Sequence, residues 1–392
     1  MLILKLAFRN IMGAGIRTWL NVFVLSLAFV MTIWVQGLVE GMNEHAMRTS
    51  IDYEYGGGQY WHSAYDPYDP FTLEESHAPL SPTLEKLVSR GEATPILLTS
   101  GAIYPDGRVH SALLKGINPQ QDILDVPSEY LESTSSGAIP GLIGSQMADQ
   151  TKLRMGDLVT VRWRDINGTF DADDVEIVQI MRNAPPAVDQ GQIWVPLERL
   201  RTMLQAPGEA TVVVLSPDIE NVPAGEGPWI HRDLDYLLAT IREFIRAKSG
   251  GSYVMYGLLL FMGLLAIFDT QVLSIWRRKK EIGTLMALGM ERSRVIGLFT
   301  FEGALHGLLA LVVGAAYGIP LMKWTIEKGI PLPEAVKDVG VALPQTLYPS
   351  YGAWLLGVTT IIVLVTVTVV SFLPASKISK MKPTEALRGK RS

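Results

Sequence analysis

The residue types that most often carry catalysis or metal binding occur in this chain without the spacing that those functions need. There are six histidines and no cysteine, and the histidines form no His-Glu-x-x-His or similar ligand pattern, so a zinc site is not expected. The sequence contains no Gly-x-x-x-x-Gly-Lys-Ser/Thr phosphate loop and no Gly-x-Ser-x-Gly nucleophile elbow. We therefore expect no catalytic centre, no metal and no cofactor in this chain.

Three ionisable residues instead fall within long apolar segments: Asp269, Glu302 and His306. An ionisable side chain at membrane depth is costly and normally faces other helices or a water-filled cavity. For Asp269 two interpretations stay open, a structural hydrogen bond to another helix and a polar hinge or substrate contact. Glu302 and His306, four residues apart on one helical face, are expected to pair with each other or with a cation near the membrane surface.

A cationic connection between two apolar segments is the strongest single feature of the sequence. One apolar run ends at Trp276, four cations follow at 277–280, and Arg292 and Arg294 precede the next run. Positive charge marks the cytoplasmic side of membrane proteins. We call residues 277–294 the elbow and expect it to join two membrane helices on the cytoplasmic side.

Within the elbow a short coupling helix is predicted at about 281–294. Ile282, Leu285, Met286 and Gly289 share one face at three- and four-residue spacing. An apolar stripe on a short helix outside the membrane must be buried against something. We expect a partner protein to cover it.

Four apolar runs are long enough to cross about 30 Å of hydrocarbon, which takes roughly 20 residues. They cover residues 18–39, 252–276, 295–322 and 352–373. The first run could instead be a cleaved signal sequence, but no small-x-small pattern follows it before Glu40, which favours a retained anchor.

The distribution of charged residues predicts which segments lie on which side of the membrane. Residues 41–249 contain 30 Asp plus Glu against 16 Lys plus Arg, whereas cations gather before the first run, in the elbow and after the fourth run. By the positive-inside rule both termini and the elbow face the cytoplasm, and the acidic segment lies on the periplasmic side. Without cysteine, that segment must be held together by burial alone.

The acidic segment mixes strand and helix signals without a βαβ rhythm, which predicts an α+β domain. The turn residues at 105–108 predict a hairpin. An apolar stripe from Leu234 to Ile245 predicts a stalk helix that runs towards the second span and is interrupted at Gly250 and Gly251. The expected strands are 96–104, 109–117, 158–163, 175–181 and 192–195, and the expected helices are 145–152 and 197–204.

The resulting fold class is a membrane protein with four transmembrane α-helices and a large α+β extracytoplasmic domain inserted between helices 1 and 2. Residues 1–40 form a cytoplasmic amphipathic lead-in and helix 1. Residues 41–249 form the periplasmic domain with its stalk. Residues 250–392 form helices 2–4 with the elbow and a basic C-terminal tail.

This order of segments resembles the FtsX/MacB-type permeases of ABC transporters. Residues 278–289 look like that family's Arg-x-x-Glu-Ile-Gly-x-x-x-Ala-Leu-Gly signature, and residues 302–303 like the Glu-Gly that follows it. Residues 374–377 and 383–388 are similar to its carboxyl-terminal ending, and 6–10 to its amino end. The resemblance covers essentially the whole chain, and its motifs are specific in combination.

The resemblance implies a non-catalytic, multi-pass subunit of the inner membrane that pairs with a second copy or a paralogue among membrane lipids. Two copies of a separate ABC ATPase subunit, which holds Mg-ATP, would grip the elbow and tilt the second span, thereby moving the periplasmic domain. No nucleic-acid partner is expected. The residues assigned to ATPase coupling are Arg278, Lys279, Lys280, Glu281, Ile282, Gly283, Leu285, Ala287, Leu288, Gly289 and Arg292.

Three segments, 115–119, 142–145 and 152–157, look most like lipoprotein-releasing permeases, although Asn118 stands where that pattern usually has Asp. This resemblance implies lipoprotein cargo and a periplasmic carrier. Two alternatives stay open: MacB-like efflux of drugs, peptides or lipids, and an FtsX-like signalling scaffold that activates cell-wall hydrolases. A membrane-anchored enzyme has the least support.

A cargo route is predicted in the lipid-facing cleft between the first and second spans of opposing subunits. Phe23, Phe29 and Trp34 of the first span are expected to line it. Aromatic residues near membrane boundaries also serve as interfacial anchors, and this alternative stays open.

Overall fold

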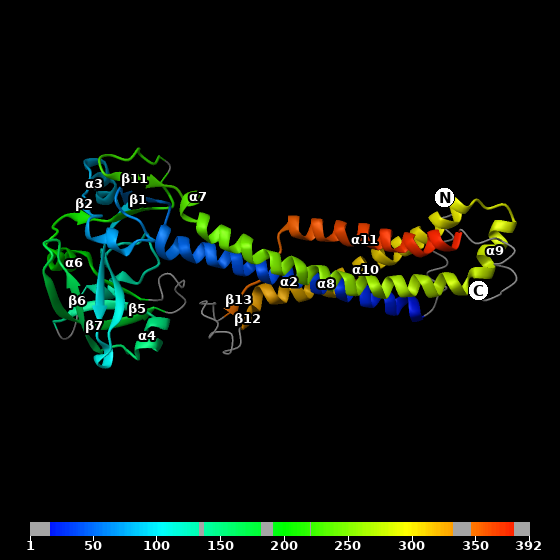
Figure 1. Cartoon of the computed structure of the whole chain (residues 1–392), viewed down its shortest axis with the longest axis horizontal. Helices are drawn as coiled ribbons and strands as arrows, with labels where there is room; N and C mark the ends of the chain where they lie inside the picture. Colours follow the sequence, from blue (N-terminus) through cyan, green and yellow to red (C-terminus); the bar gives the residue numbers. More distant parts are fainter. Residues whose placement is uncertain (1–15, 133–136, 182–190, 220, 332–345, 380–392) are drawn as a thin grey trace. The chain divides into compact units, whose positions relative to one another are not determined.

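The chain divides into two compact units (Figure 1). The sheet unit spans Glu44–Phe244, and the helical unit is built from the helices before and after it. The amino-terminal lead-in and the basic tail predicted from the sequence lie outside the described residues. The computed structural model describes residues 16–132, 137–181, 191–219, 221–331 and 346–379.

The sheet unit contains most of the strands predicted from the sequence together with short helices. Its strands are β1 (Gln59–His62), β2 (Ala78–Pro79), β3 (Ala93–Ile103), β4 (His110–Ile117), β5 (Ile139–Gly144), β6 (Leu158–Arg164), β7 (Phe170–Met181), β8 (Gln192–Pro196), β9 (Glu209–Ala210), β10 (Val212–Leu215) and β11 (Trp229–Arg232). Its helices are η1 (Ile51–Tyr55), η2 (Pro70–Glu74), α3 (Pro82–Ser89), η3 (Pro105–Gly107), η4 (Ser128–Leu131), α4 (Ser145–Thr151), α6 (Leu197–Leu204) and α7 (Leu234–Leu237). The expected mixture of strands and helices is confirmed.

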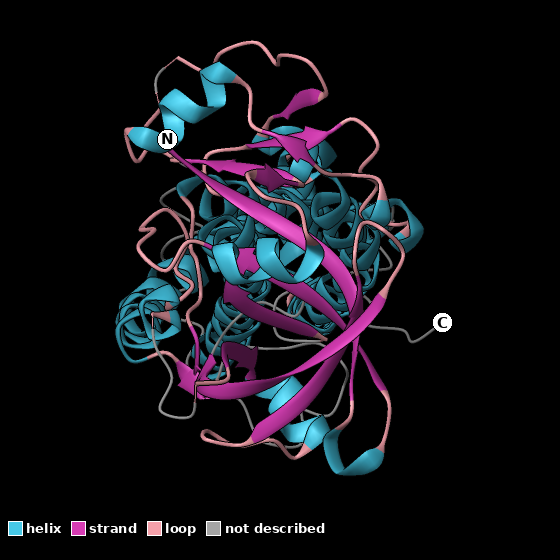
Figure 2. Ribbon diagram, turned by 90° about the vertical axis from the view of Figure 1, so that its left-hand side faces the viewer, coloured by secondary structure: helices cyan, strands magenta, loops and turns pink. Residues whose placement is uncertain are grey.

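Six of the strands close into a barrel. The large sheet has the order β11-β1-β10-β3-β4-β8-β5-β7-β6, and β6 also pairs with β3, with Gly101 opposite Trp163 and Ile103 opposite Val161. Figure 2 shows the strands curving round. The pairs β4–β8 and β5–β7 are parallel and the other pairs of the barrel are antiparallel. Closure removes the free edges that an open sheet would present.

The alternating sequence of β6 explains which side of the barrel is buried. Val159, Val161 and Trp163 are buried, whereas the residues between them are exposed. Because successive side chains of a strand point to opposite faces, such a strand separates a core from solvent. Met147 of α4 and Leu200 of α6 pack into the same core cluster.

The predicted hairpin at residues 105–108 joins β3 and β4, with Ile103 opposite His110. Asp106 and Gly107 both have positive φ, at 49° and 73°. Asp and Gly tolerate this left-handed conformation better than other residues, which is why their position marks the turn.

The helical unit is made of long helices that lie side by side (Figure 1). Two of them, α2 and α8, extend across the boundary into the sheet unit. The elements are α2 (Ile16–Ser50), α8 (Ala239–Arg277), α9 (Lys279–Ala287), α10 (Arg292–Lys328), β12 (Ile330–Pro331), β13 (Thr346–Leu347) and α11 (Ala353–Ser379).

Three of the described helices are long and apolar enough to cross a membrane: Val22–Tyr55, Arg292–Lys328 and Ala353–Lys377. These contain the predicted third span and nearly all of the predicted first and fourth spans. The predicted second span, 252–276, lies within the continuous helix α8, in which the side chains of residues 266, 267, 270 and 271 are not described. The fourth crossing therefore stays a prediction.

The predicted stalk is divided at a different place from the one expected. Helix α7 ends at Leu237, with Leu238 at its C-cap, and α8 begins at Ala239. Gly250 and Gly251, where an interruption was predicted, lie inside α8 and are helical. Glycine costs a helix about 1 kcal/mol relative to alanine, which the long flanking helix overcomes.

Glycines of α10 bring the helices into close contact. A Cβ on Gly318 would lie 2.9 Å from a methyl carbon of Val30 in α2, and one on Gly307 would lie 3.2 Å from Val367 in α11. Thr359 Oγ1 in α11 also donates a hydrogen bond to Gln36 Oε1 in α2 at 2.7 Å. Small residues allow such close approach between helices in lipid, as the spacing predicted.

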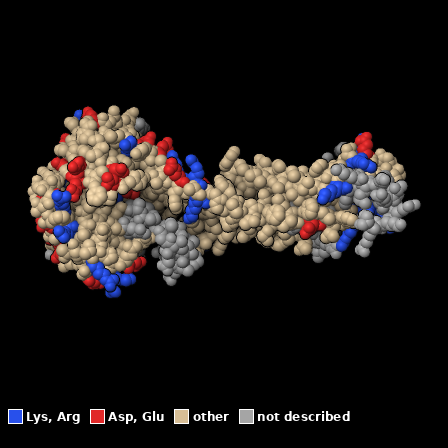
Figure 3. Space-filling model, viewed as in Figure 1, with Lys and Arg blue, Asp and Glu red and all other residues tan. Residues whose placement is uncertain are grey.

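The first residues of α2, the elbow and the last residues of α11 lie at the same end of the helical unit (Figure 1). On the face shown in Figure 3, a long stretch of the helices carries no charged side chain, and charged side chains lie on both sides of this stretch. This is the distribution that a layer of hydrocarbon across the middle of the helices requires.

We expect Gly318→Leu to lower the stability of the helical unit by about 1–3 kcal/mol, because the new side chain overpacks the contact with Val30. The matched control is Gly357→Leu in α11, where a Cβ would meet no atom within 4 Å. Thermal unfolding in detergent measures both variants. Equal melting temperatures would show that α2 and α10 do not pack as described.

Candidate functional site at the elbow

The elbow is built from two helices and a tight turn. Helix α9 ends at Ala287, and Glu291, with extended backbone, is the N-cap of α10. Gly289 has φ of +94°, a conformation that favours glycine, so this residue allows the sharp turn between the helices. The single coupling helix predicted over 281–294 is therefore wrong in its extent, because the turn divides it.

Arg278 holds the elbow together. Its Nε and Nη2 donate to the two carboxylate oxygens of Glu281 at 2.8 and 2.9 Å, and its Nη1 donates to Glu302 Oε2 at 2.9 Å. The guanidinium also lies 5.0 Å from the ring centroid of Phe299. A planar guanidinium suits such a bidentate pair with stacking, whereas lysine would not reproduce it.

The two carboxylates differ in burial. The side chain of Glu302 is 6% exposed, whereas that of Glu281 is largely in contact with solvent. A buried charge that loses its partner is strongly destabilising, so Glu302 makes Arg278 indispensable to the elbow. The hydrogen bond from Arg278 lowers the pKa of Glu281, and the same bond, helped by the charge of Glu302, raises the pKa of Arg278. Both groups therefore stay charged near neutral pH.

An apolar cluster lies beside this ion pair. Ile275 at the end of α8, Ile282 of α9, Val295 and Phe299 of α10, and Ala375 of α11 are all buried in it. Ile282 is 1% exposed. The chain's own helices therefore cover Ile282, whereas Gly289 of the predicted stripe is exposed, and the covering of the stripe by a partner protein stays a prediction.

The exposed tip of the elbow has a different composition. Leu288 is 80% exposed, and Ala287 and Gly289 beside it are exposed as well. Lys280 and Arg292 are also exposed. The elbow therefore presents an exposed apolar side chain and exposed cations, on a base fixed by Arg278.

The other predicted coupling residues take supporting positions. Gly283 is buried, and Lys279 Nζ lies 5.4 Å from the ring centroid of Trp276. The side chain of Leu285 lies outside the described residues. Their role in coupling stays a prediction.

Of the two predicted forms of pairing, the structure shows the one with a cation. Glu302 binds the cation Arg278, as described above, and the Nδ1 atom of His306 lies 2.7 Å from the backbone oxygen of Glu302. These contacts give both side chains a structural role in α10.

Asp269 does not make the expected hydrogen bond to another helix of this chain among the described residues. It lies exposed on α8, on the same face as Leu258, Phe261, Leu265 and Leu273, which are exposed too. We call these five residues the open face of α8. Since an ionisable residue is costly in lipid, a charged Asp269 requires something other than lipid on this face.

The three aromatic residues predicted to line a cargo route are not equivalent. Phe23 is 52% exposed, with its ring 6.5 Å from that of Tyr317, and Trp34 is half-buried. Phe29 is only 8% exposed and packs in the core of the helical unit beside Gly314. The assignment of Phe29 to a cargo surface is therefore wrong, because its ring fills space between α2 and α10.

Segments with the lipoprotein-releasing pattern show ordinary structural roles. Lys115 is buried, with its Nζ 3.2 Å from Glu54 Oε1. Lys152 and Gly156 have positive φ, so turn geometry accounts for the residues at 152–157, the alternative that the sequence had left open.

Phe299 and Ala375 were missed by sequence reasoning. Phe299 stands between two motif segments, and a motif pattern gives no sign that its ring supports Arg278. Ala375 belongs to the carboxyl-terminal motif, but its contact with α9 joins residues almost a hundred positions apart. In the described part of the chain no group of three or more His, Asp and Glu side chains is arranged to hold a metal.

Comparisons with known proteins agree with the resemblance seen in the sequence. Residues 253–383 match the family FtsX-like permease C-terminal. The chain is 22% identical, over 74% of its length and 76% of the relative's, to the lipoprotein-releasing system transmembrane protein LolC of Xylella fastidiosa. It is 31% identical to an uncharacterized ABC transporter permease of Methanocaldococcus jannaschii, over 33% of this chain and 30% of that one.

Among solved structures, the extracellular domain of the noncanonic ABC-type transporter YknZ from Gram-positive bacteria matches with 12% identity. The match covers 42% of this chain and 83% of that chain, with a TM-score of 0.24, which is too low to establish a common fold.

Arg278→Gln is expected to destabilise the helical unit by about 3 kcal/mol, because it leaves the buried Glu302 carboxylate without its cation. Arg294→Gln is the control, since its pair with Glu291 is exposed and long at 3.7 Å, and such pairs contribute about 0–1 kcal/mol. Thermal unfolding in detergent compares the variants. Similar losses in both would refute a central role for Arg278.

Proposed function

This chain carries an FtsX-like permease domain and belongs to the ABC transporter permeases, and from that premise we propose that it converts ATP hydrolysis by a separate subunit into movement of its sheet unit. The observation that carries the proposal is the exposed Leu288 tip on a base fixed by Arg278. A projecting apolar side chain among cations suits a groove of another protein. In this proposal Mg-ATP binds in the partner subunit, which also supplies the catalytic groups for its hydrolysis.

The rigidity of the base supports this role. A force applied at Leu288 passes through α9 to Arg278 and the apolar cluster, which contact α8, α10 and α11 together. α8 is one helix from the elbow to the start of the sheet unit. A continuous helix transmits displacement along its axis. In this proposal the elbow faces the cytoplasm and the sheet unit the periplasm, as the distribution of cations favours.

The permease works as a pair in this proposal, with the open face of α8 turned towards the second subunit. The apolar residues of that face could meet lipid, but Asp269 among them is costly there. A second permease, as an identical copy or a paralogue, removes Asp269 from lipid. It also accounts for the absence of a partner for Asp269 within the described residues of this chain.

Lipoproteins of the inner membrane are the proposed cargo. Support comes from the similarity to a lipoprotein-releasing system transmembrane protein over most of both chains. Release needs a periplasmic carrier to receive the acylated protein. MacB-like efflux and an FtsX-like signalling scaffold are the competing functions. Depletion of the chain in cells distinguishes these functions from lipoprotein release.

Depletion of this chain is expected to leave lipoproteins in the inner membrane, which fractionation of the two membranes measures. Depletion of a chain required for efflux would raise drug sensitivity while lipoproteins stay correctly placed. Chaining or lysis with normal lipoproteins would instead identify a scaffold, and either of these outcomes contradicts the proposed cargo.

Leu288→Glu is expected to abolish most of the stimulation of ATPase activity by cargo in the reconstituted complex, because it replaces the projecting apolar contact by a charge. The residue is 80% exposed, so folding of the chain is unaffected. Met155→Glu, at an exposed position of the sheet unit, serves as the control. Normal stimulation and normal recovery of the ATPase with Leu288→Glu would reject the tip as the contact.

The pairing is tested with single cysteines, since the natural chain has none. Leu265→Cys on the open face of α8 is expected to give disulfide-linked permease pairs in membranes, whose mass distinguishes two copies from a copy and a paralogue. Leu264→Cys, which packs towards the core of the helical unit, is the control. Only unlinked chains from Leu265→Cys would contradict the arrangement.

A further inference from the structure

The cations of the elbow outnumber the carboxylates that pair with them. The elbow contains six Lys or Arg residues and two Glu residues. Arg278 engages Glu281 together with the buried Glu302 of α10. The Nε atom of Arg294 lies 3.7 Å from Glu291 Oε2. Among the described residues no carboxylate forms an ion pair with the remaining four, which we call the surplus cations: Arg277, Lys279, Lys280 and Arg292.

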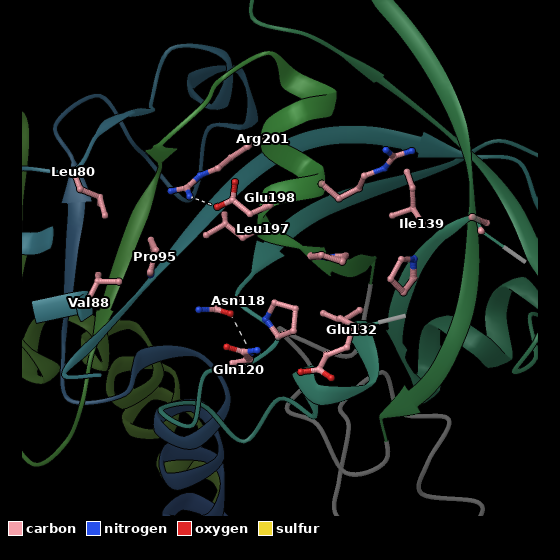
Figure 4. Close-up of a pocket in the computed structure, with 17 residues that line it drawn as sticks. Leu80, Val88, Pro95, Asn118, Gln120, Glu132, Ile139, Leu197, Glu198 and Arg201 are labelled. Atoms are coloured by element: carbon pink, nitrogen blue, oxygen red, sulfur yellow. Dashed lines mark hydrogen bonds and ion pairs between the residues drawn. The ribbon is translucent and has the colours of Figure 1, made fainter. Parts of the chain in front are cut away.

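Two arginines in a cleft of the sheet unit are paired, by contrast. This cleft of about 930 Å³ is lined in part by the start of β5 and the end of β8. Arg201 Nη1 donates to Glu198 Oε1 at 2.7 Å (Figure 4). Arg199 Nη2 donates to Asp173 Oδ2 at 3.0 Å. The charge of both arginines is thus compensated within the chain, so the elbow attracts an anion more strongly than this cleft does.

The end of α8 places three of the surplus cations at the level of a membrane surface. Ile275 is fully buried and packs with Val295 and Ala375. These two residues lie near the start of α10 and near the end of α11, two helices that are long and apolar enough to cross a membrane. The chain therefore leaves the apolar layer at about Trp276. Three surplus cations follow within the next four residues.

Trp276 supplies an interfacial group beside these cations. Its side chain is 56% exposed, and Lys279 Nζ lies 5.4 Å from the centroid of its ring. Tryptophan at the end of an apolar helix sits at the level of the lipid headgroups. The attraction between the ammonium group and the face of the indole holds Lys279 at the same level.

The headgroup of an anionic glycerophospholipid matches this arrangement. Each Lys or Arg immediately outside a membrane helix raises the affinity for anionic lipid about fivefold. A zwitterionic lipid such as phosphatidylcholine also carries a phosphate, but its own ammonium group neutralises that charge. A soluble anion would meet the cations without the contact between lipid and indole that an interfacial tryptophan makes.

We propose that Trp276, Arg277 and Lys279 form a binding site for the headgroup of an anionic glycerophospholipid. Arg277 and Lys279 engage the phosphate, and the indole of Trp276 lies against the glycerol and the first part of the acyl chains. The inference goes beyond the proposed function, because it involves neither the cargo nor the Leu288 tip. It rests on the membrane surface lying at the end of α8.

The test measures the quenching of tryptophan fluorescence by brominated lipids, with the full chain in nanodiscs. All nanodiscs contain equal amounts of phosphatidylglycerol and phosphatidylcholine, and only one of the two lipids carries bromine on its acyl chains. Because the chain has nine tryptophans, the fluorescence that Trp276→Phe removes defines the contribution of Trp276. We expect brominated phosphatidylglycerol to quench this contribution more strongly than brominated phosphatidylcholine does.

Trp354 is the matched control for this measurement. It is 83% exposed near the start of α11, and no charged residue lies within ten positions of it in the sequence. The fluorescence that Trp354→Phe removes is expected to be quenched equally by the two brominated lipids.

Substitution of single cations tests which side chains form the site. Arg277→Gln and Lys279→Gln are each expected to lower the preference for phosphatidylglycerol at Trp276 about fivefold. Arg277→Lys is expected to retain it, because the phosphate requires the charge. Arg277 is exposed, so its replacement leaves the base fixed by Arg278 intact, which an unchanged melting temperature verifies.

Three results would overturn the proposal. The first is equal quenching of Trp276 by the two brominated lipids. The second is a preference that persists in both glutamine variants, since the elbow as a whole would then attract lipid without a site at Trp276. The third is a loss of the preference in inorganic phosphate but not in sodium chloride at equal ionic strength, which would assign the cations to a soluble anion.

Discussion

The buried ion pair of Arg278 and Glu302 is the interaction on which the elbow depends. Glu302 is fixed within α10, and burial of its carboxylate is tolerable only because a guanidinium reaches it. The same guanidinium holds both oxygens of Glu281 on α9. One side chain thus fixes the direction in which α9 leaves α8, and with it the position of Leu288.

The helices of the helical unit pack closely on one side, whereas one face of α8 stays exposed. Close contacts at Gly307 and Gly318 join α10 to α11 and α2. The open face of α8 is not covered by other helices in this way. Its five residues, Leu258, Phe261, Leu265, Asp269 and Leu273, are all exposed. A helix that is packed on one side and open on the other can be stabilised by a second subunit, and Asp269 supplies the energetic reason for one.

The sheet unit shows how local chemistry limits the pairing of strands. Its barrel is closed by pairing of β3 with β6, yet two prolines, Pro140 in β5 and Pro196 in β8, prevent these strands from pairing along their whole length.

The sequence by itself determined the helical segments, the hairpin at 105–108, the strands of the acidic segment and the family of the chain. These follow from local properties: apolar length, turn residues, alternation and motifs of adjacent residues. It also offered a cation as one of two possible partners for Glu302, since an ionisable side chain at membrane depth needs a partner.

Only the tertiary structure decided which side chains remain for partners. Ile282 and the ring of Phe29 were expected at surfaces, but each is buried by helices distant in sequence. The closure of the barrel, the pairing partner of Glu302 and the cleft between β5 and β8 likewise depend on long-range contacts. Periodicity shows that a face must be buried, and the fold alone selects what buries it.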